Sequence, residues 1–308
     1  MSKNLVAIAR SLKLPQVPWL RKVLAGVVLL GSVAFLAYKT YTSWSELRSY
    51  EWQIRVGYLL PIFVTCLLQT LVVTRGWQSI MSCVAEGMPF RRHLKILGYT
   101  NLMRRIPAGW LWSTAGRLHA YRDQNVPARR SALGSALELM IAIVTALPLA
   151  ALALAELDLL PGYMGLPLAL VALAVEVALL HPALLTRLVK LVRQELGVSK
   201  LRYRDTLNWA ALYTLMWLVS SVGFYLIICL FTPLPLARLP YAAGVWVLST
   251  LIAQLTMFSP SGLGVKEMSL TVMLEPLLPP PLPLVVAVAT RLILTVYDLL
   301  IGALASRL

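Results

Sequence analysis

The chain has little charge and few cysteines and histidines. Charged residues make up 13% of its 308 residues, against about a quarter in soluble domains. The three cysteines and three histidines show no CxxC or Cys/His spacing. The sequence therefore favours neither a disulfide framework nor a zinc site.

Motifs for nucleotide use and hydrolysis are also missing. There is no GxxxxGK[ST] loop, GxSxG, HExxH or DDxxD, and such motifs mark ATP-driven, acyl-transfer and metal-dependent chemistry. We expect no cofactor, no metal and no catalytic residues, and a function that ATP hydrolysis does not drive.

Hydrophobic residues are abundant instead, at 59% of the chain, and the mean hydropathy is +0.75. Several apolar runs are long enough to cross about 30 Å of hydrocarbon at about 1.5 Å per residue. We predict one all-α, polytopic membrane domain over 1–308 with about eight spans. The predicted spans are 23–40, 57–74, 132–155, 163–181, 207–231, 240–258, 265–279 and 283–305.

The net charge of +15 is a property of the connections between spans. Basic residues gather in 1–22, 75–131 and 186–206, whereas the connections 156–158 and 232–240 have few. This pattern follows the positive-inside rule and favours a membrane protein over a nucleic-acid-binding one. We expect a bacterial inner-membrane protein with both termini in the cytoplasm, the basic N-terminus (1–22) leading into an uncleaved signal-anchor.

Two segments break the regular pattern of spans. The segment 92–122 is too charged to cross and too apolar for a free loop, and the segment 259–281 holds an apolar piece of about 15 residues, too short to cross unaided. Each contains a Pro/Gly break, made of Pro107 and Gly109 in the first and Pro260, Ser261, Gly262 and Gly264 in the second.

Such breaks free backbone groups that lipid cannot satisfy, so they need protein or a wet cavity around them. Paired breaks in two halves of a membrane protein are a pointer to a transporter binding site. We predict a re-entrant hairpin at 92–122, with a surface amphipathic helix as the alternative. At 259–281 we predict a broken helix and a short half-helix, and the two breaks raise inverted-repeat halves as a hypothesis.

Ionisable residues inside predicted spans are the main candidates for function, because burying them in lipid is costly. The candidates for proton coupling are Glu138, Glu176, Glu267 and Asp298. Arg291 is a candidate clamp for a phosphate or carboxylate. Its structural alternative is an ion pair with Glu267 or Glu138, and the structural alternative for Glu267 is a carboxylate at a helix start.

Arginines also surround the first break. Arg104, Arg105 and Arg117 are candidates to bind a phosphate together with the free backbone N–H groups. The alternative reading is ordinary positive charge at the cytoplasmic surface.

The residues at the second break resemble the membrane region of the lysylphosphatidylglycerol synthase family. That family has a Pro-Gly-Gly-hydrophobic-Gly-x-x-Glu pattern, a short helix, and a span with an embedded Arg and a late Gly. The matching residues here are Pro260, Gly262, Gly264, Glu267, Arg291 and Gly302, with Ser261 in place of a glycine. Pro107, Gly109 and Glu138 look similar to a second family feature, although Ala108 separates the first two and Gly116-Arg117 replaces a Gly-Glu. The resemblance implies an eight-helix lipid translocase with two re-entrant elements, here without the synthase domain.

We therefore predict a lipid translocase that moves an anionic phospholipid or a polyprenyl-phosphate-linked sugar to the outer leaflet. Its substrate-binding residues are Arg104, Arg105, Arg117, Glu138, Glu267 and Arg291. One alternative is a membrane-embedded transferase with Glu267 or Asp298 as base. Another is a non-transporting partner of a glycosyltransferase or lipid synthase.

Overall fold

The computed structural model describes residues 34–35, 37–85, 87–103, 109–191, 201–256 and 264–307. Regular structure in these ranges is helical, and they contain no strand. The elements, in chain order, are α3 (Trp44–Ser49), η1 (Val56–Tyr58), α4 (Leu59–Val84), α5 (Phe90–Leu102), α6 (Gly109–Arg122), α7 (Ala128–Glu156), α8 (Gly162–Leu179), α9 (Pro182–Leu191), α10 (Tyr203–Phe231), η4 (Leu236–Arg238), α11 (Leu239–Leu255), α12 (Val265–Leu274) and α13 (Leu282–Ser306). The all-α prediction is confirmed.

Six candidate membrane spans lie in the described part of the chain, formed by α4, α7, α8, α10, α11 and α13 with their short flanking turns. Each is long and apolar enough to cross a bilayer, which indicates a multi-pass membrane protein. The predicted span 265–279 contains the ten-residue helix α12. The predicted span 23–40 falls mostly outside the described residues.

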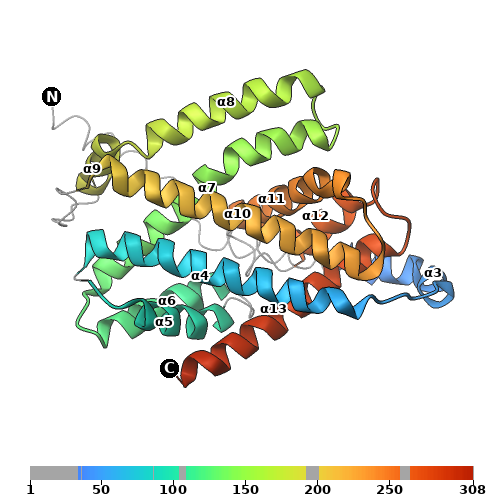
Figure 1. The fold of residues 1–308 in the computed structure, drawn as a ribbon, viewed down its shortest axis with the longest axis horizontal. Coiled ribbons are helices and arrows are strands. Elements are labelled where there is room, and N and C mark those ends of the chain that lie inside the picture. Colours follow the sequence, from blue (N-terminus) through green and yellow to red (C-terminus); the bar gives the residue numbers. More distant parts are fainter. Residues whose placement is uncertain are drawn as a thin grey trace.

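Helices α4 and α10 run antiparallel through the centre of the bundle (Figure 1). Near the start of α10, Asn208 Nδ2 donates to Ser79 Oγ near the end of α4, at 3.0 Å. At the opposite end, the Arg55 N–H just before α4 donates to the carbonyl of Leu230, at 2.9 Å. We call the end of the bundle where α4 ends and α10 begins the first side, and the opposite end the second side.

Two pairs of shorter helices each form a helical hairpin. In the pair α5–α6, Gly116 in the middle of α6 lies against Thr100 near the end of α5. Tyr121 near the end of α6 lies against His93 near the start of α5, so the two helices are antiparallel. In the pair α11–α12, the Tyr241 hydroxyl near the start of α11 donates to the carbonyl of Met273 near the end of α12, at 3.1 Å. The pair α5–α6 joins α4 to α7, so it begins and ends at the first side. The pair α11–α12 joins α10 to α13, so it begins and ends at the second side. Figure 1 shows α5 and α6 near one end of α4 and α12 toward the other.

The long helix after each pair packs on the other pair. Helix α13 packs on α5, where a Cβ added to Gly302 would collide with the side chain of Leu102. Helix α7 packs on α11, where a Cβ on Gly244 would lie 3.0 Å from Ala153 Cβ. Small residues at these crossings allow the backbones to approach closely, as is common between helices in membranes.

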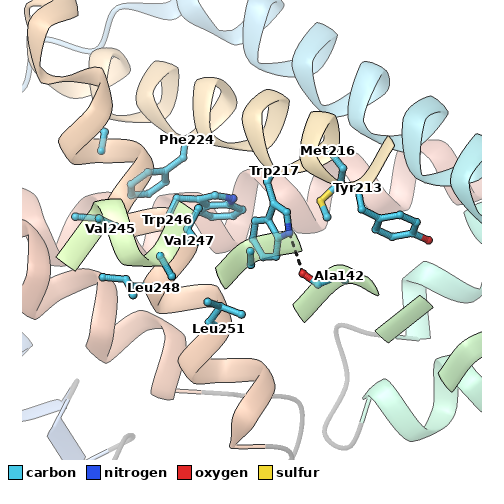
Figure 2. Close-up of a cluster of buried hydrophobic side chains, with 14 of the residues drawn as sticks. Ala142, Tyr213, Met216, Trp217, Phe224, Val245, Trp246, Val247, Leu248 and Leu251 are labelled. Atoms are coloured by element: carbon cyan, nitrogen blue, oxygen red, sulfur yellow. Dashed lines mark hydrogen bonds between the residues drawn. The ribbon is translucent and has the colours of Figure 1, made fainter. Parts of the chain in front are cut away.

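The core lies where α10, α11 and α7 meet (Figure 2). Trp217 of α10 donates its indole N–H to the carbonyl of Ala142 on α7, at 3.0 Å. The rings of Phe224 and Trp246 stack with centroids 5.2 Å apart, which joins α10 to α11. Helix α8 packs on α7 and contacts α9, and it stands apart from this core (Figure 1).

Candidate functional site

The first cluster of charge lies between α6 and α7. Arg117 of α6 is 2% exposed, and its Nη1 donates to Glu138 Oε2 on α7 in an ion pair. Its Nε and Nη2 are also buried, and no acceptor among the described residues binds them. A guanidinium carries five N–H donors in a fixed fork, so one edge of this fork lies buried beside the pair without a hydrogen-bond acceptor from the described chain.

Aromatic side chains hold the guanidinium of Arg117 in place. Its Cζ lies 4.9 Å from the ring centre of Trp77, which comes from α4. The Trp77 indole N–H donates to the hydroxyl of Tyr121 at 2.6 Å, and that hydroxyl lies 2.5 Å from His93 Nδ1 on α5. The cluster thus joins all four helices of the first half, α4 to α7.

Burial keeps both His93 and Tyr121 uncharged. It lowers the pKa of His93 to about 4, so the ring is neutral at neutral pH. It also raises the pKa of Tyr121, so the hydroxyl keeps its proton. Because an indole N–H can only donate, Tyr121 accepts from Trp77. The tautomer of the His93 ring decides which of the hydroxyl and Nδ1 donates to the other.

The second cluster lies between α12 and α13. Arg291 Nη1 donates to Glu267 Oε1 at 2.5 Å. The other oxygen of Glu267 accepts the N–H of Gly264 at 2.9 Å, at the start of α12. Gly264 has φ 84°, in the left-handed region that favours glycine. Of the two acids expected to pair with Arg291, Glu267 is therefore the partner, and it also lies at a helix start.

The second pair is more open than the first. The side chain of Arg291 is 30% exposed and that of Glu267 is 7% exposed. Beside this pair, Lys266 Nζ lies 3.6 Å from the ring centre of Trp246, the residue that stacks on Phe224 in the core. A tryptophan thus lies beneath a cation in both halves, at Trp77 and at Trp246.

Buried polar atoms lie close to both predicted breaks. Near the end of α5, Asn101 Oδ1 is buried, and near the end of α11 so are Thr250 Oγ1 and Gln254 Oε1. None of the three has a hydrogen-bond partner within the described ranges. Buried polar atoms normally have partners, and the described part of the chain supplies none to these three oxygens.

Several predicted site residues lie outside the described residues. They are Arg104, Arg105, Pro107, Pro260, Ser261 and Gly262. Gly109 is the first residue of α6. The prediction that Arg117 binds a phosphate together with two neighbouring arginines therefore stays a prediction.

The structure does not bring Glu176 or Asp298 into either ion pair. Glu176 is 6% exposed on α8 and lines a groove of about 410 Å³ between α8 and α10. Asp298 is half-buried on α13, two turns beyond Arg291.

Sequence reasoning missed Trp77, Tyr121 and His93. Trp77 lies in an apolar helix, and Tyr121 and His93 lie in a charged segment. Only the packing of α4 against the α5–α6 pair brings them to Arg117. The sequence feature nearest to these residues is the mixture of aromatic and basic residues in 92–122. That mixture indicates a segment at the membrane interface, but it does not predict which side chains are in contact.

In the described part of the chain, no group of three or more His, Cys, Asp or Glu side chains is arranged to hold a metal ion. Comparison with protein-family models finds no match to this chain, and comparison with curated proteins finds none either. The resemblance to the lysylphosphatidylglycerol synthase family therefore rests on the residues named above and stays a hypothesis.

Proposed function

We propose that this chain is a lipid translocase of the bacterial inner membrane. Its substrate is a lipid with an anionic head group, either a phospholipid or a polyprenyl-phosphate-linked sugar, which moves from the cytoplasmic to the outer leaflet. Six candidate spans and the short paired helices between them support a pathway inside the bundle. The resemblance to the lysylphosphatidylglycerol synthase family supports the same class of substrate.

The observation that carries the proposal is the half-paired guanidinium of Arg117. Leaving buried donors without acceptors is costly, and the cost is higher near a charge. A phosphate offers several acceptor oxygens, and two of them can accept the two parallel N–H groups of a guanidinium edge. A lipid phosphate at the free Nε–Nη2 edge would satisfy these donors, while Glu138 keeps its bond to Nη1.

The charge distribution supports an orientation for this site. Basic residues cluster at the first side, in the connections around α5, α9 and the start of α7, so by the positive-inside rule this side faces the cytoplasm. In this arrangement α5–α6 and α11–α12 are re-entrant pairs, so α11 turns back with α12 although it is long enough to cross. The crossings are then α4, α7, α8, α10 and α13 together with 23–40, and the two termini lie in the cytoplasm. A synthase or glycosyltransferase that makes the lipid would act as the partner on that side.

Transport in this proposal runs downhill or is coupled to protons. The carboxylates available for coupling are Glu138, Glu267, Glu176 and Asp298. The first two are already bound to arginines.

The test is movement of fluorescent phosphatidylglycerol across the bilayer of proteoliposomes. Hydrogen bonds from a charged donor are worth about 1.5–3 kcal/mol each, so Arg117→Gln is expected to slow movement about tenfold or more. Arg117→Lys keeps the charge and loses the fork, so it should also slow transport while the protein stays folded. The matched control is Arg75→Gln, because Arg75 is exposed on α4 and binds only Gln78 there among described side chains.

Transport at the wild-type rate by folded Arg117→Gln and Arg117→Lys proteins would remove Arg117 from the pathway. Absence of lipid movement by the wild-type protein, with phosphatidylglycerol and with a polyprenyl-phosphate sugar alike, would contradict the translocase itself. Formation of a new lipid product from a sugar or aminoacyl donor would favour the transferase alternative.

A further inference from the structure

The two central helices contact each other in a reciprocal way. Gly76 of α4 lies under the ring of Tyr213 of α10, and Gly223 of α10 lies under the side chain of Thr65 of α4. Each helix thus offers one glycine to a side chain of the other, about ten residues apart on both. This is the pattern expected where two equivalent antiparallel helices meet at a two-fold axis.

The other helices pair in the same reciprocal way. The pair α5–α6 is followed by α7, which packs on α11, and the pair α11–α12 is followed by α13, which packs on α5. Exchanging α4 to α7 with α10 to α13 therefore leaves the same pairs of helices packed together. Because α4 and α10 are antiparallel, the exchange also inverts the direction across the membrane.

Polar residues occupy matching positions in the two halves. Asn101 lies six residues before Pro107, and Gln254 lies six residues before Pro260. Both are side-chain amides with a buried oxygen that no described residue binds. Glu138 follows Pro107 by 31 residues, and Arg291 follows Pro260 by the same 31 residues. Glu138 and Arg291, which are one member of each ion pair, thus occupy matching positions and carry opposite charges.

The two ion pairs lie at similar depths from opposite ends of the bundle. Glu138 is ten residues beyond the start of α7 at the first side, which is about 15 Å of helix. Arg291 is nine residues beyond the start of α13 at the second side, or about 14 Å. Each half therefore holds an arginine, a glutamate and an amide at a comparable distance from its own side.

From these matches we propose that the chain is an inverted repeat with two half-sites for one anionic head group. Arg117, Glu138 and Asn101 form the half-site that opens to the first side. Arg291, Glu267 and Gln254 form the half-site that opens to the second side. The proposal rests on the proposed function for its ligand, a phosphate-bearing lipid, which each half-site binds in turn.

The test measures from which side each half-site is reached. In a background with Cys66, Cys83 and Cys229 replaced by alanine, Asn101→Cys and Gln254→Cys provide matched reporters. A small, anionic, membrane-impermeant methanethiosulfonate is applied to right-side-out and to inverted membrane vesicles. Asn101→Cys should react only from the first side and Gln254→Cys only from the second.

Two loop positions identify the sides in the same vesicles. Gln124→Cys, between α6 and α7, marks the first side, and Leu236→Cys, between α10 and α11, marks the second. Reaction of both reporters from one side overturns the inverted repeat. So does failure of either reporter to react in vesicles when it reacts fully in denaturant, because no aqueous route then reaches it.

Ligand protection tests the chemistry of the two half-sites. Dihexanoyl phosphatidylglycerol at about four times its Kd should slow the reaction of both reporters about fivefold, whereas dihexanoyl phosphatidylcholine should not. If inorganic phosphate alone protects both reporters equally well, the ligand of the half-sites is a free anion and not a lipid. Protection of only one reporter would overturn the second half-site. These measurements do not require transport, so opposite sidedness without lipid movement would contradict the translocase and leave the repeat intact.

Discussion

The guanidinium of Arg117 lies 4.9 Å from the ring centre of Trp77, on a helix that begins 25 residues after α4 ends. A cation over an indole is worth about 0.5–2 kcal/mol, more where water is excluded. Trp77 therefore fixes the position of the charge without using any of its N–H donors. The Nε–Nη2 edge has no acceptor among the described residues.

Substitution of Trp77 separates the role of its ring from that of its N–H. We expect Trp77→Phe to keep most of the cation–π contact and to lose the hydrogen bond to Tyr121. Trp77→Leu should lose both and destabilise the folded protein more, by about 3 kcal/mol or above, because the side chain is fully buried. Thermal unfolding in detergent measures both variants. Equal stability of the two would show that the ring contact with Arg117 contributes nothing.

Removing one partner of the buried pair Arg117–Glu138 should cost more than removing both. Glu138→Gln leaves a buried cation without its counter-charge, which costs about 3–5 kcal/mol. The double variant Arg117→Gln/Glu138→Gln removes that charge and should recover part of the loss. Chemical unfolding of the two single variants and the double variant gives the coupling between the residues. If the loss of unfolding free energy in the double variant equals the sum of the losses in the two single variants, the ion pair is contradicted.

We expect any side chain at position 264 to destabilise the folded protein. Its φ of 84° is strained for any other L residue, so Gly264→Ala should lower the free energy of unfolding by about 1–2 kcal/mol. The substitution should also weaken the start of α12, where the Gly264 N–H binds Glu267. Gly57→Ala is the control, because a Cβ at Gly57 meets nothing within 4 Å. A loss no larger at Gly264 than at Gly57 would count against this backbone geometry.

The buried His93 gives the protein a sensitivity to acid. Its pKa is lowered to about 4 in the folded state, against about 6.5 in the unfolded chain, so the unfolded chain binds the proton more readily. The contribution of the neutral ring is complete above about pH 6.5 and is lost as the pH falls toward 4. We expect the unfolding temperature to drop across this window. His93→Asn places an amide oxygen where Nδ1 lies, and it should flatten the drop. An unchanged pH profile would mean that His93 takes up its proton over the same pH range in the folded and unfolded states.

Most of the span boundaries could be predicted from the sequence, because membrane helices are set by length and apolar content. The main miss is α4, predicted to end at residue 74 and found to continue to Val84. Arg75 and Gly76 resemble a helix end in the sequence. In the fold Arg75 is exposed and Gly76 provides room for Tyr213, so neither residue stops the helix.

The charged residues of the site could be named from the sequence, because ionisable groups inside apolar runs are few. The pairing of Arg291 with Glu267 was one of two alternatives that the sequence offered, but the pairing of Arg117 was not predicted. Arg117 was expected to act with neighbouring arginines, and it binds Glu138 across 21 residues of sequence. Such contacts depend on how the short helices fold back, which residue spacing does not encode.

The exchange of packing between the halves has a consequence for how the protein must assemble. Helix α13 packs on α5 and helix α7 on α11, so each half leaves one packing face of its last helix uncovered when the other half is absent. If the gene were divided between α9 and α10, we expect neither fragment to accumulate by itself. Made together in one cell, the two fragments should rescue each other and be recovered as a single complex.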